Sequence, residues 1–383
     1  MGIFSKKKKK KNTPSINLIT KGGYNDYETA FVVGVLCLFG IMMIYSTSYV
    51  RAIEEEQPTY YYAMSQAKYC LVGFVGMFIL SYINYEFVRK ISWVLMVGAL
   101  LLCVLTLFVG VEVNGSKRWL EVAGHRFQPS EFAKPAIALF TANICSSHPK
   151  LMQSFQGIWK ATVLQLLTVG AIAKENLSTG VVCAGIVVIM VFVTTKNYKA
   201  FGLYTGMLVA GAIGLLVAMA YRSARIDAWF HPEGENGYQV RNSLYAVGSG
   251  GLMGKGIGKG IQKNILPESH NDMIFSNICE ELGIFGAVCV LILFTVLVIR
   301  LYYIAQDSKD RFGGLLVTAV LSQIAVQVII NVGVAVNFMP NTGMALPFVS
   351  YGGTSLLMHL AEIGILLNVE RQGNPYEKVR LQA

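Results

Sequence analysis

The stretch that decides the fold is Pro267-Glu268-Ser269-His270-Asn271-Asp272-Met273-Ile274-Phe275, which leads into an apolar run from Ile278 to Ile304. The run is long enough to cross a bilayer, so the polar stretch lies where a hydrophobic span begins. A carboxylate costs roughly 2.5–3.5 kcal/mol at full membrane depth and usually marks a pathway or a site there. We therefore interpret Asp272 as the leading candidate for a reacting group; the alternative is a simple cap on the following helix.

Composition places the chain in a membrane. Its 383 residues are 54% hydrophobic and only 14% charged, and the mean hydropathy is +0.51. No ordinary soluble domain of this length has such values, and no nucleic-acid partner is expected. The seven cysteines lie within or beside apolar runs, without a CxxC motif or a metal-ligand spacing, which indicates small core residues.

Apolar windows of about 20 residues predict about ten transmembrane helices, and hence an all-α polytopic membrane protein. A large extracytoplasmic loop, residues 221–273, is expected between helices 7 and 8. The expected spans are residues 29–49, 67–84, 91–111, 130–147, 158–173, 177–195, 199–220, 274–305, 313–337 and 347–368.

The placement of lysine and arginine predicts the topology. The run Lys6 to Lys11 lies in a basic tail, residues 1–28, and such a run is typical of the cytoplasmic side; attraction to anionic lipid is the alternative. One transmembrane domain, residues 29–369, then ends in a second cytoplasmic tail, residues 370–383. The loops on the outer side nevertheless carry Arg118, Arg225 and Lys263, which topology alone does not explain.

Two neighbouring motifs could form a polar notch at the membrane edge. They are Asn114-Gly-Ser-Lys-Arg-Trp-Leu-Glu121 and Phe127-Gln-Pro-Ser-Glu-Phe-Ala-Lys134. Pro129 is typical of a helix start, after which Glu131 and Lys134 share one helix face. Trp119 beside Arg118 resembles an interfacial aromatic with a headgroup-level cation. The simpler interpretation is an ion pair plus a belt residue; the functional one is a site for a lipid-linked anion.

Three further features lie near Asp272. The glycine-rich stretch Gly248–Gly260 lacks the spacing of a nucleotide-binding phosphate loop, because position 249 is Ser and Gly256 replaces the required hydroxyl residue. It is therefore either a basic loop that approaches phosphate or a plain flexible loop. Of Glu280 and Glu281, at least one should face protein or water. The stretch Pro340–Ser355 predicts broken or re-entrant backbone, or else a tight turn.

Together these residues resemble the SEDS family, the FtsW, RodA and SpoVE group. The motifs that carry the resemblance occur in family order: Asn114-Gly115 with Arg118-Trp119, Phe127–Lys134, Tyr238-Gln239 with Ala246–Gly251, Leu266-Pro-Glu268 with Asp272, Glu280-Glu-Leu-Gly283 and Leu346-Pro-Phe-Val-Ser-Tyr-Gly-Gly353. The Tyr60-Tyr-Tyr region and Val111-Glu-Val-Asn114 are more similar to the FtsW and SpoVE branch.

The resemblance implies a peptidoglycan glycosyltransferase that polymerises lipid II at the outer face of the bacterial cytoplasmic membrane, in septal or spore cell-wall synthesis. It implies a class B penicillin-binding protein as partner, beside other division or elongation membrane proteins. The family's essential acid falls on Asp272 and its polar cavity residues on Glu131 and Lys134. At one point the chain departs from the family, since Lys174-Glu-Asn-Leu-Ser-Thr179 has Asn176 where many members have an aspartate.

The chemistry of such a reaction agrees with these residue types. A lipid pyrophosphate is a good leaving group, so the reaction needs a base for the acceptor hydroxyl, worth about 10²–10⁴-fold, and cations near the pyrophosphate. Asp272 would be the base. The candidate substrate-binding residues are Glu131, Lys134, Arg118, Trp119, Arg225, Lys263 and Ser350. A divalent cation could share the work of the cations, although the sequence shows no dedicated ligand set.

Two other functions compete with this one. A lipid II flippase would also use a polar notch among about ten spans, and a non-catalytic scaffold would recruit a penicillin-binding protein. A flippase should depend on charges through the whole membrane depth, whereas the middles of the expected spans carry few charges. That pattern favours chemistry at the outer edge.

Overall fold

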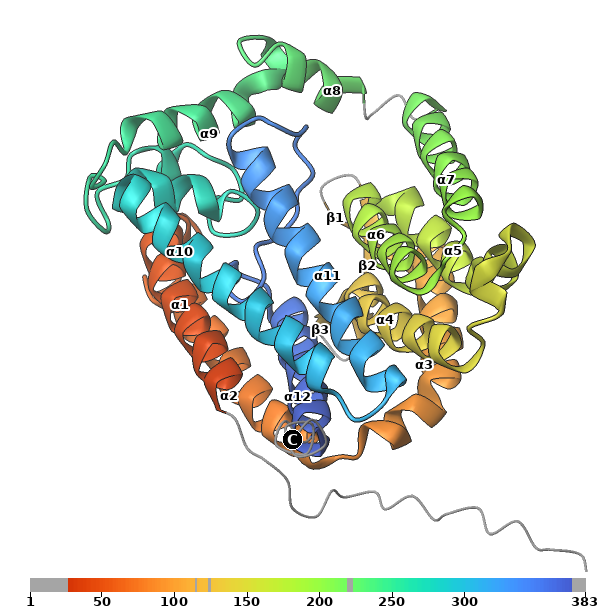
Figure 1. Ribbon diagram of the computed structural model, residues 1–383. Coiled ribbons are helices and arrows are strands. Elements are labelled where there is room, and N and C mark those ends of the chain that lie inside the picture. The colour runs from red at the N-terminus through yellow and green to blue at the C-terminus, as the bar shows by residue number, and fades with distance from the viewer. Residues whose placement is uncertain (1–26, 114–115, 123–124, 219–222, 374–383) are drawn as a thin grey trace, which may run out of the picture.

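The computed structural model describes residues 27–113, 116–122, 125–218 and 223–373, and Figure 1 shows them as a bundle of long helices. The helices are α1 Glu28–Glu54, α2 Tyr61–Tyr82, α3 Tyr85–Val109, α4 Pro129–Ser147, α5 Phe155–Glu175, α6 Leu177–Thr194, α7 Tyr198–Ala218, α8 Ser223–Phe230, α9 Tyr238–Ser249, α10 Ile274–Asp307, α11 Arg311–Ala335 and α12 Gly353–Gln372. Short 3₁₀ turns lie at Leu151–Gln153, Glu235–Gly237 and Gln262–Asn264.

Each expected span overlaps a long helix, namely α1 to α7 and α10 to α12, although some bounds differ by six residues. Within the described ranges, six of these are long and apolar enough to cross a membrane: α1, α2, α3, α6, α10 and α11. That the other four also cross stays a prediction. The fold is therefore mostly helical and membrane-spanning, as expected.

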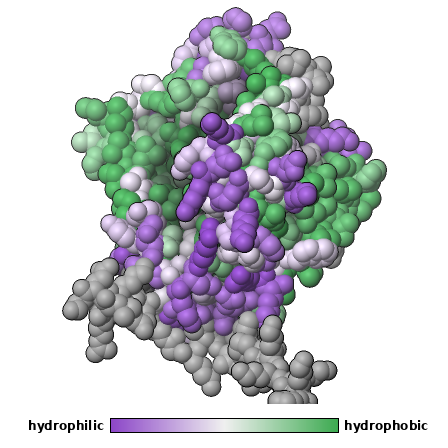
Figure 2. Space-filling model, turned by 45° about the vertical axis from the view of Figure 1, so that its right-hand side comes forward, coloured by the Kyte–Doolittle hydropathy of each residue, from purple (hydrophilic) through white to green (hydrophobic). Residues whose placement is uncertain are grey.

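The outer surface of the bundle is apolar where lipid would touch it. Figure 2 shows hydrophobic side chains over broad areas of two flanks, with hydrophilic ones gathered at the top and along a central band. On α10, for example, the side chains of Ile284, Val288 and Ile292 are exposed. Cys289, on the same helix, is exposed too, so it is not the core residue expected, whereas the other six cysteines are buried. Large exposed apolar areas of this kind mark a lipid or protein contact.

The expectation of an all-α fold is wrong in one segment. An antiparallel sheet of three strands, β1 Val111–Val113, β2 Ser116–Val122 and β3 His125–Phe127, follows α3. The registers pair Val111 with Trp119 and Leu120 with Phe127. The Asn-Gly pair between the first two strands is a hairpin signal in the sequence, and the sheet holds Arg118 and Trp119 on β2.

The long loop, residues 221–273, is largely folded where it is described. In Figure 1, α8 and α9 lie at the top of the bundle, across the ends of the longer helices. Ser243 on α9 contacts Ser276 on α10 at 2.6 Å and donates to the carbonyl of Ala335 on α11 at 2.9 Å. Trp229 on α8 donates to the carbonyl of Asn337 at 3.1 Å. Helix α9 is thus packed against the bundle, and the side of the membrane that the loop faces stays a prediction.

The two ends of the described chain lie on one face of the molecule. Arg300, near the end of α10, pairs with Glu28 at the start of α1 at 2.9 Å and with Glu370 near the end of α12 at 3.8 Å. This agrees with two termini on the same side of the membrane. Most of both expected tails lies outside the described residues.

The glycine-rich stretch completes a break in α10. Gly283 interrupts the helix with φ +67° and ψ −167°, which leaves backbone groups without helical partners. Gly251 and Leu252 accept hydrogen bonds from the two residues after the break, at 2.9 and 3.1 Å, and Lys255 and Gly256 donate to the two carbonyls before Leu282, both at 2.9 Å. The stretch is therefore docked backbone to backbone, and the interpretation as a plain flexible loop is wrong.

Candidate functional site

Asp272 lies in the turn before α10 and is held from three sides through its backbone and that of its neighbours. Its side chain is buried, with 9% exposed. Asn331 on α11 donates to the backbone carbonyl of Asp272 at 2.9 Å, and Ser350 donates to the carbonyl of Asn271 at 2.6 Å. Tyr351 donates its N–H to the carbonyl of His270 at 3.0 Å. These contacts fix the turn, but none of them uses the carboxylate.

The carboxylate of Asp272 is open to a further ligand. Among the described residues, none donates a hydrogen bond to its Oδ1, although that atom is buried. Its Oδ2 lies 3.4 Å from where a Cβ on Gly343 would stand, and Gly343 has φ +64°. A glycine at this position therefore allows the backbone to pass close to the acid.

A cavity of about 80 Å³ lies beside this point. It is lined by Arg118, Glu175, Asn176, Leu177, Ser178, Arg225, Ile226, Pro340, Asn341 and Thr342. Thr342 directly precedes Gly343, so the cavity wall continues to the acid. Arg118 also lines a smaller cavity with Ser130, at the start of α4. The structure thus places Arg118 and Arg225, two of the candidate cations, in the wall of one cavity, and both act electrostatically on Asp272.

Burial brings the pKa of the Asp272 carboxyl close to neutral pH. Desolvation, reinforced by the carboxylate of Glu268, raises the pKa of Asp272 to about 7, against the opposing effect of Arg225 and Arg118. A neighbouring histidine behaves differently, because burial and the positive Arg51 lower the pKa of His270 to about 4. Near neutrality Asp272 is therefore the group of the two that titrates. The cap role considered for Asp272 is not seen, since Met273 is the N-cap of α10 and makes no side-chain cap bond.

His270 belongs to an aromatic cluster that supports the turn. Its ring lies 5.0 Å from that of Tyr62 on α2 and 5.5 Å from that of Tyr351. Tyr62 and Tyr351 contact each other edge-on at 5.2 Å. Arg51 pairs with Glu268 at 3.7 Å and lies over the Tyr62 ring, 5.8 Å from its centroid. The end of α1 and the start of α2 thus pack against the segment that carries the acid.

Glu131 and Lys134 form a buried ion pair on α4, with Lys134 Nζ 2.7 Å from Glu131 Oε2. The sequence interpretation passed over a second buried group on α12, where His359 lies 3.1 Å from Glu362. Gln323 on α11 donates to Glu362 at 2.8 Å. The missed signal was available, since an ionisable residue inside an apolar span is uncommon. The expectation of few charges in the span middles fails on α12.

Three other predicted site residues have different surroundings. Lys263 is buried and contacts Glu281 at 2.8 Å. Ser350 uses its hydroxyl to bind Asn271 and to accept from the N–H of Leu346 at 2.8 Å. Trp119 is half-buried on β2. Neither Lys263, Ser350 nor Trp119 lines the cavity with the two arginines.

The departure from the family pattern at Asn176 has a structural counterpart. Asn176 is the N-cap of α6, and its side chain accepts the N–H of Thr179 at 3.2 Å. Its neighbour Glu175 lines the same cavity and accepts the N–H of Lys117 at 3.1 Å. A carboxylate is thus present one position earlier. Within the described chain, no three His, Cys, Asp or Glu side chains gather as a metal site would require.

The fold and the site define a class of protein. It is a helical membrane protein with a buried acid at the start of a span, near a cavity that two arginines line. The chain belongs to the FtsW, RodA and SpoVE family, described as cell cycle protein, which it matches over residues 27–374. The resemblance seen in the motifs is thereby confirmed.

The names of two relatives agree with this family assignment. Stage V sporulation protein E of Bacillus subtilis is 36% identical over 368 residues, covering 92% of this chain and 99% of that protein. The probable peptidoglycan glycosyltransferase FtsW of Trichlorobacter lovleyi is 35% identical over 355 residues, covering 90% and 93%.

Solved structures share the fold. One is described as "Structural coordination of polymerization and crosslinking by a peptidoglycan synthase complex"; the TM-score is 0.75 at 26% identity, covering 91% of this chain and 98% of that one. The crystal structure of Thermus thermophilus rod shape determining protein RodA matches with a TM-score of 0.69 at 25% identity, covering 91% and 97%.

Proposed function

We propose that this chain is a peptidoglycan glycosyltransferase that polymerises lipid II, with Asp272 as the general base. The observation that carries the proposal is the buried carboxylate of Asp272, whose pKa is raised to about 7. It lies against Gly343, the residue after Thr342 in the wall of a cavity that also holds Arg118 and Arg225. The names of the relatives support the reaction class. The sporulation in one relative's name and the family's description as cell cycle protein support septal or spore wall synthesis.

The reaction would proceed by direct displacement. Asp272 takes the proton of an acceptor sugar hydroxyl. The oxygen of that hydroxyl forms a bond to the anomeric carbon of the donor. The bond from that carbon to the lipid pyrophosphate breaks, and the pyrophosphate leaves with the electron pair. A base whose pKa lies near the working pH combines a useful ionised fraction with strong proton affinity.

Arg118 and Arg225 would stabilise the departing pyrophosphate. Both line the cavity and act electrostatically on Asp272, which indicates that their charges reach the acid. Preorganised cations at a developing charge are among the largest contributions to catalysis. Glu131 and Lys134 remain candidates for binding the polar headgroup, because a buried ion pair in a membrane span usually has a function beyond packing.

The site would work at the outer membrane face, with both termini in the cytoplasm. The shared face of the two ends and the basic tail support this orientation. We propose a class B penicillin-binding protein as partner, since a structural neighbour belongs to a complex for polymerization and crosslinking.

The test is a lipid II polymerisation assay with the purified chain, alone and with its class B penicillin-binding protein. Glycan polymer on a gel, formed when the partner's own active site is blocked, is the expected result. A vesicle assay for transbilayer movement of lipid II runs in parallel. Movement without polymer, with the partner present, would favour the flippase; neither activity would favour the scaffold.

A further inference from the structure

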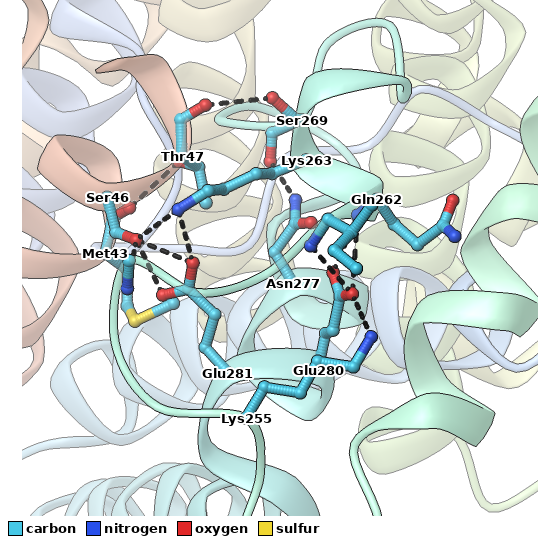
Figure 3. Close-up of polar contacts among 12 residues, drawn as sticks. Met43, Ser46, Thr47, Lys255, Gln262, Lys263, Ser269, Asn277, Glu280 and Glu281 are labelled. Atoms are coloured by element: carbon cyan, nitrogen blue, oxygen red, sulfur yellow. Dashed lines mark hydrogen bonds and ion pairs between the residues drawn. The ribbon is translucent and has the colours of Figure 1, made fainter. Parts of the chain in front are cut away.

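Two consecutive glutamates on α10 are fully buried and each is matched by one lysine. Glu280 and Glu281 both have 0% exposure. Lys255 Nζ lies 2.7 Å from Glu280 Oε1, and Lys263 Nζ lies 2.8 Å from Glu281 Oε1. Glu280 also accepts the N–H of Ile261 at 2.9 Å. Figure 3 shows both lysines reaching from the segment before Asp272 toward the two carboxylates.

Ser46 on α1 completes the inner pair. Its hydroxyl lies 2.7 and 2.6 Å from the two carboxylate oxygens of Glu281, and 3.1 Å from Lys263 Nζ. The N–H of Gly258 donates to the same hydroxyl at 3.1 Å. Lys263, Glu281 and Ser46, which we call the latch, therefore join α1, α10 and the glycine-rich segment, as Figure 3 shows.

The latch closes a loop of chain with the acid at its middle. Lys263 and Glu281 are 18 positions apart, and Asp272 lies nine residues from each. Inside this loop, Asn277 donates to the carbonyl of Ser269 at 2.8 Å, and Ser269 donates to the carbonyl of Thr47 at 3.2 Å. Both arms of the loop are thus tied to each other and to α1.

A buried ion pair is a poor means of stabilisation, because apolar residues of similar volume often stabilise as well or better. Its directional contacts can instead specify one geometry. We propose that Glu281 is a positioning residue for Asp272: through Lys263 and Ser46 it sets where the carboxylate stands relative to the arginine-lined cavity. This proposal rests on the proposed function, since it concerns the same base.

The test compares three variants in the lipid II assay. Glu281→Gln should lower kcat at least about tenfold while KM for lipid II stays within about twofold, because misplacement of a reacting group by one ångström can cost 10²-fold. The double variant Lys263→Met with Glu281→Met should keep the wild-type melting temperature and remain slow. The reversed pair, Lys263→Glu with Glu281→Lys, should recover kcat, since Ser46 can contact either group.

The control is Glu86→Gln on α3. It breaks a partly exposed ion pair, in which Glu86 lies 3.4 Å from Arg89, and it should retain full kcat. Full kcat in Glu281→Gln, or kcat that follows melting temperature across all variants, would overturn the proposal. Asp272→Asn in the same assay separates the two claims. If Asp272→Asn is inactive and Glu281→Gln is fully active, only the positioning role of the latch is rejected. If Asp272→Asn is active, the assignment of Asp272 as the base is rejected.

Discussion

The side-chain amide of Asn331 donates to the backbone carbonyl of Asp272 at 2.9 Å and to that of Met344 at 2.6 Å. One amide therefore joins α11, the turn before α10 and the irregular stretch before α12. The carboxylate of Asp272 is left to other ligands. The position of the acid is thus set through its backbone, and its chemistry remains available.

Replacement of Asn331 should affect rate through this junction. Asn331→Asp puts an acceptor against two carbonyls and leaves both without a donor, which costs about 1–3 kcal/mol for each buried group. We expect kcat for polymerisation to fall at least tenfold. Asn236→Asp, at an exposed position, is the control and should retain activity. Unchanged kcat in Asn331→Asp would show that the junction does not position the acid.

The pH dependence of polymerisation should follow Asp272. The base must be ionised, so the rate should rise with pH through a midpoint of about 7. Glu268→Gln removes a like charge and should lower the midpoint, whereas Arg225→Gln removes an opposite charge and should raise it. The profile is measured for all three proteins from pH 5 to 9. Midpoints that do not move in these two directions would contradict the assignment.

Asp272 should also destabilise the folded state at neutral pH. Its folded pKa of about 7 lies above the ordinary value of 3.8, so the unfolded chain binds fewer protons between these values and stability falls as pH rises from about 4 to 7. Asp272→Asn removes this penalty, on the order of 4 kcal/mol at pH 8. We expect its melting temperature to exceed that of the wild type at pH 8 and the difference to shrink at pH 5. A lower melting temperature at pH 8 would argue against the raised pKa.

The break in α10 depends on glycine. Gly283 has φ +67°, and a Cβ there would stand 2.4 Å from the backbone N of Gly254. Gly283→Ala should therefore destabilise by about 1–3 kcal/mol or more and lower activity with it. Gly248→Ala, where a Cβ would meet nothing within 4 Å, is the matched control. Equal melting temperatures of the two variants would contradict the docked geometry.

Apolar length and motif order made the fold predictable. Each expected span overlaps a helix, and Asp272 lies at the head of α10 as its position before the apolar run implied. Arg118 and Arg225 were candidates from the sequence, because cations on the outer side needed a reason, but their meeting in one cavity was not predicted. These inferences depend on the residues within one segment, and those can be read directly from the sequence.

Long-range pairing was not predictable in the same way. Lys263 was predicted to face the substrate, but its partner Glu281 is 18 positions away and also contacts Ser46 on α1. The glycine-rich stretch gave no sign that it complements the break at Gly283, since backbone hydrogen bonds leave no trace in side-chain pattern. Such contacts depend on how helices far apart in sequence meet.

The most direct test of the central claim is polymerisation by Asp272→Asn in complex with its class B penicillin-binding protein, with lipid II binding measured on the same sample. We predict wild-type assembly and binding within about threefold, with the rate of glycan formation reduced at least about 10²-fold. Polymer from Asp272→Asn at the wild-type rate would contradict the account, because the reaction would then not depend on this carboxylate.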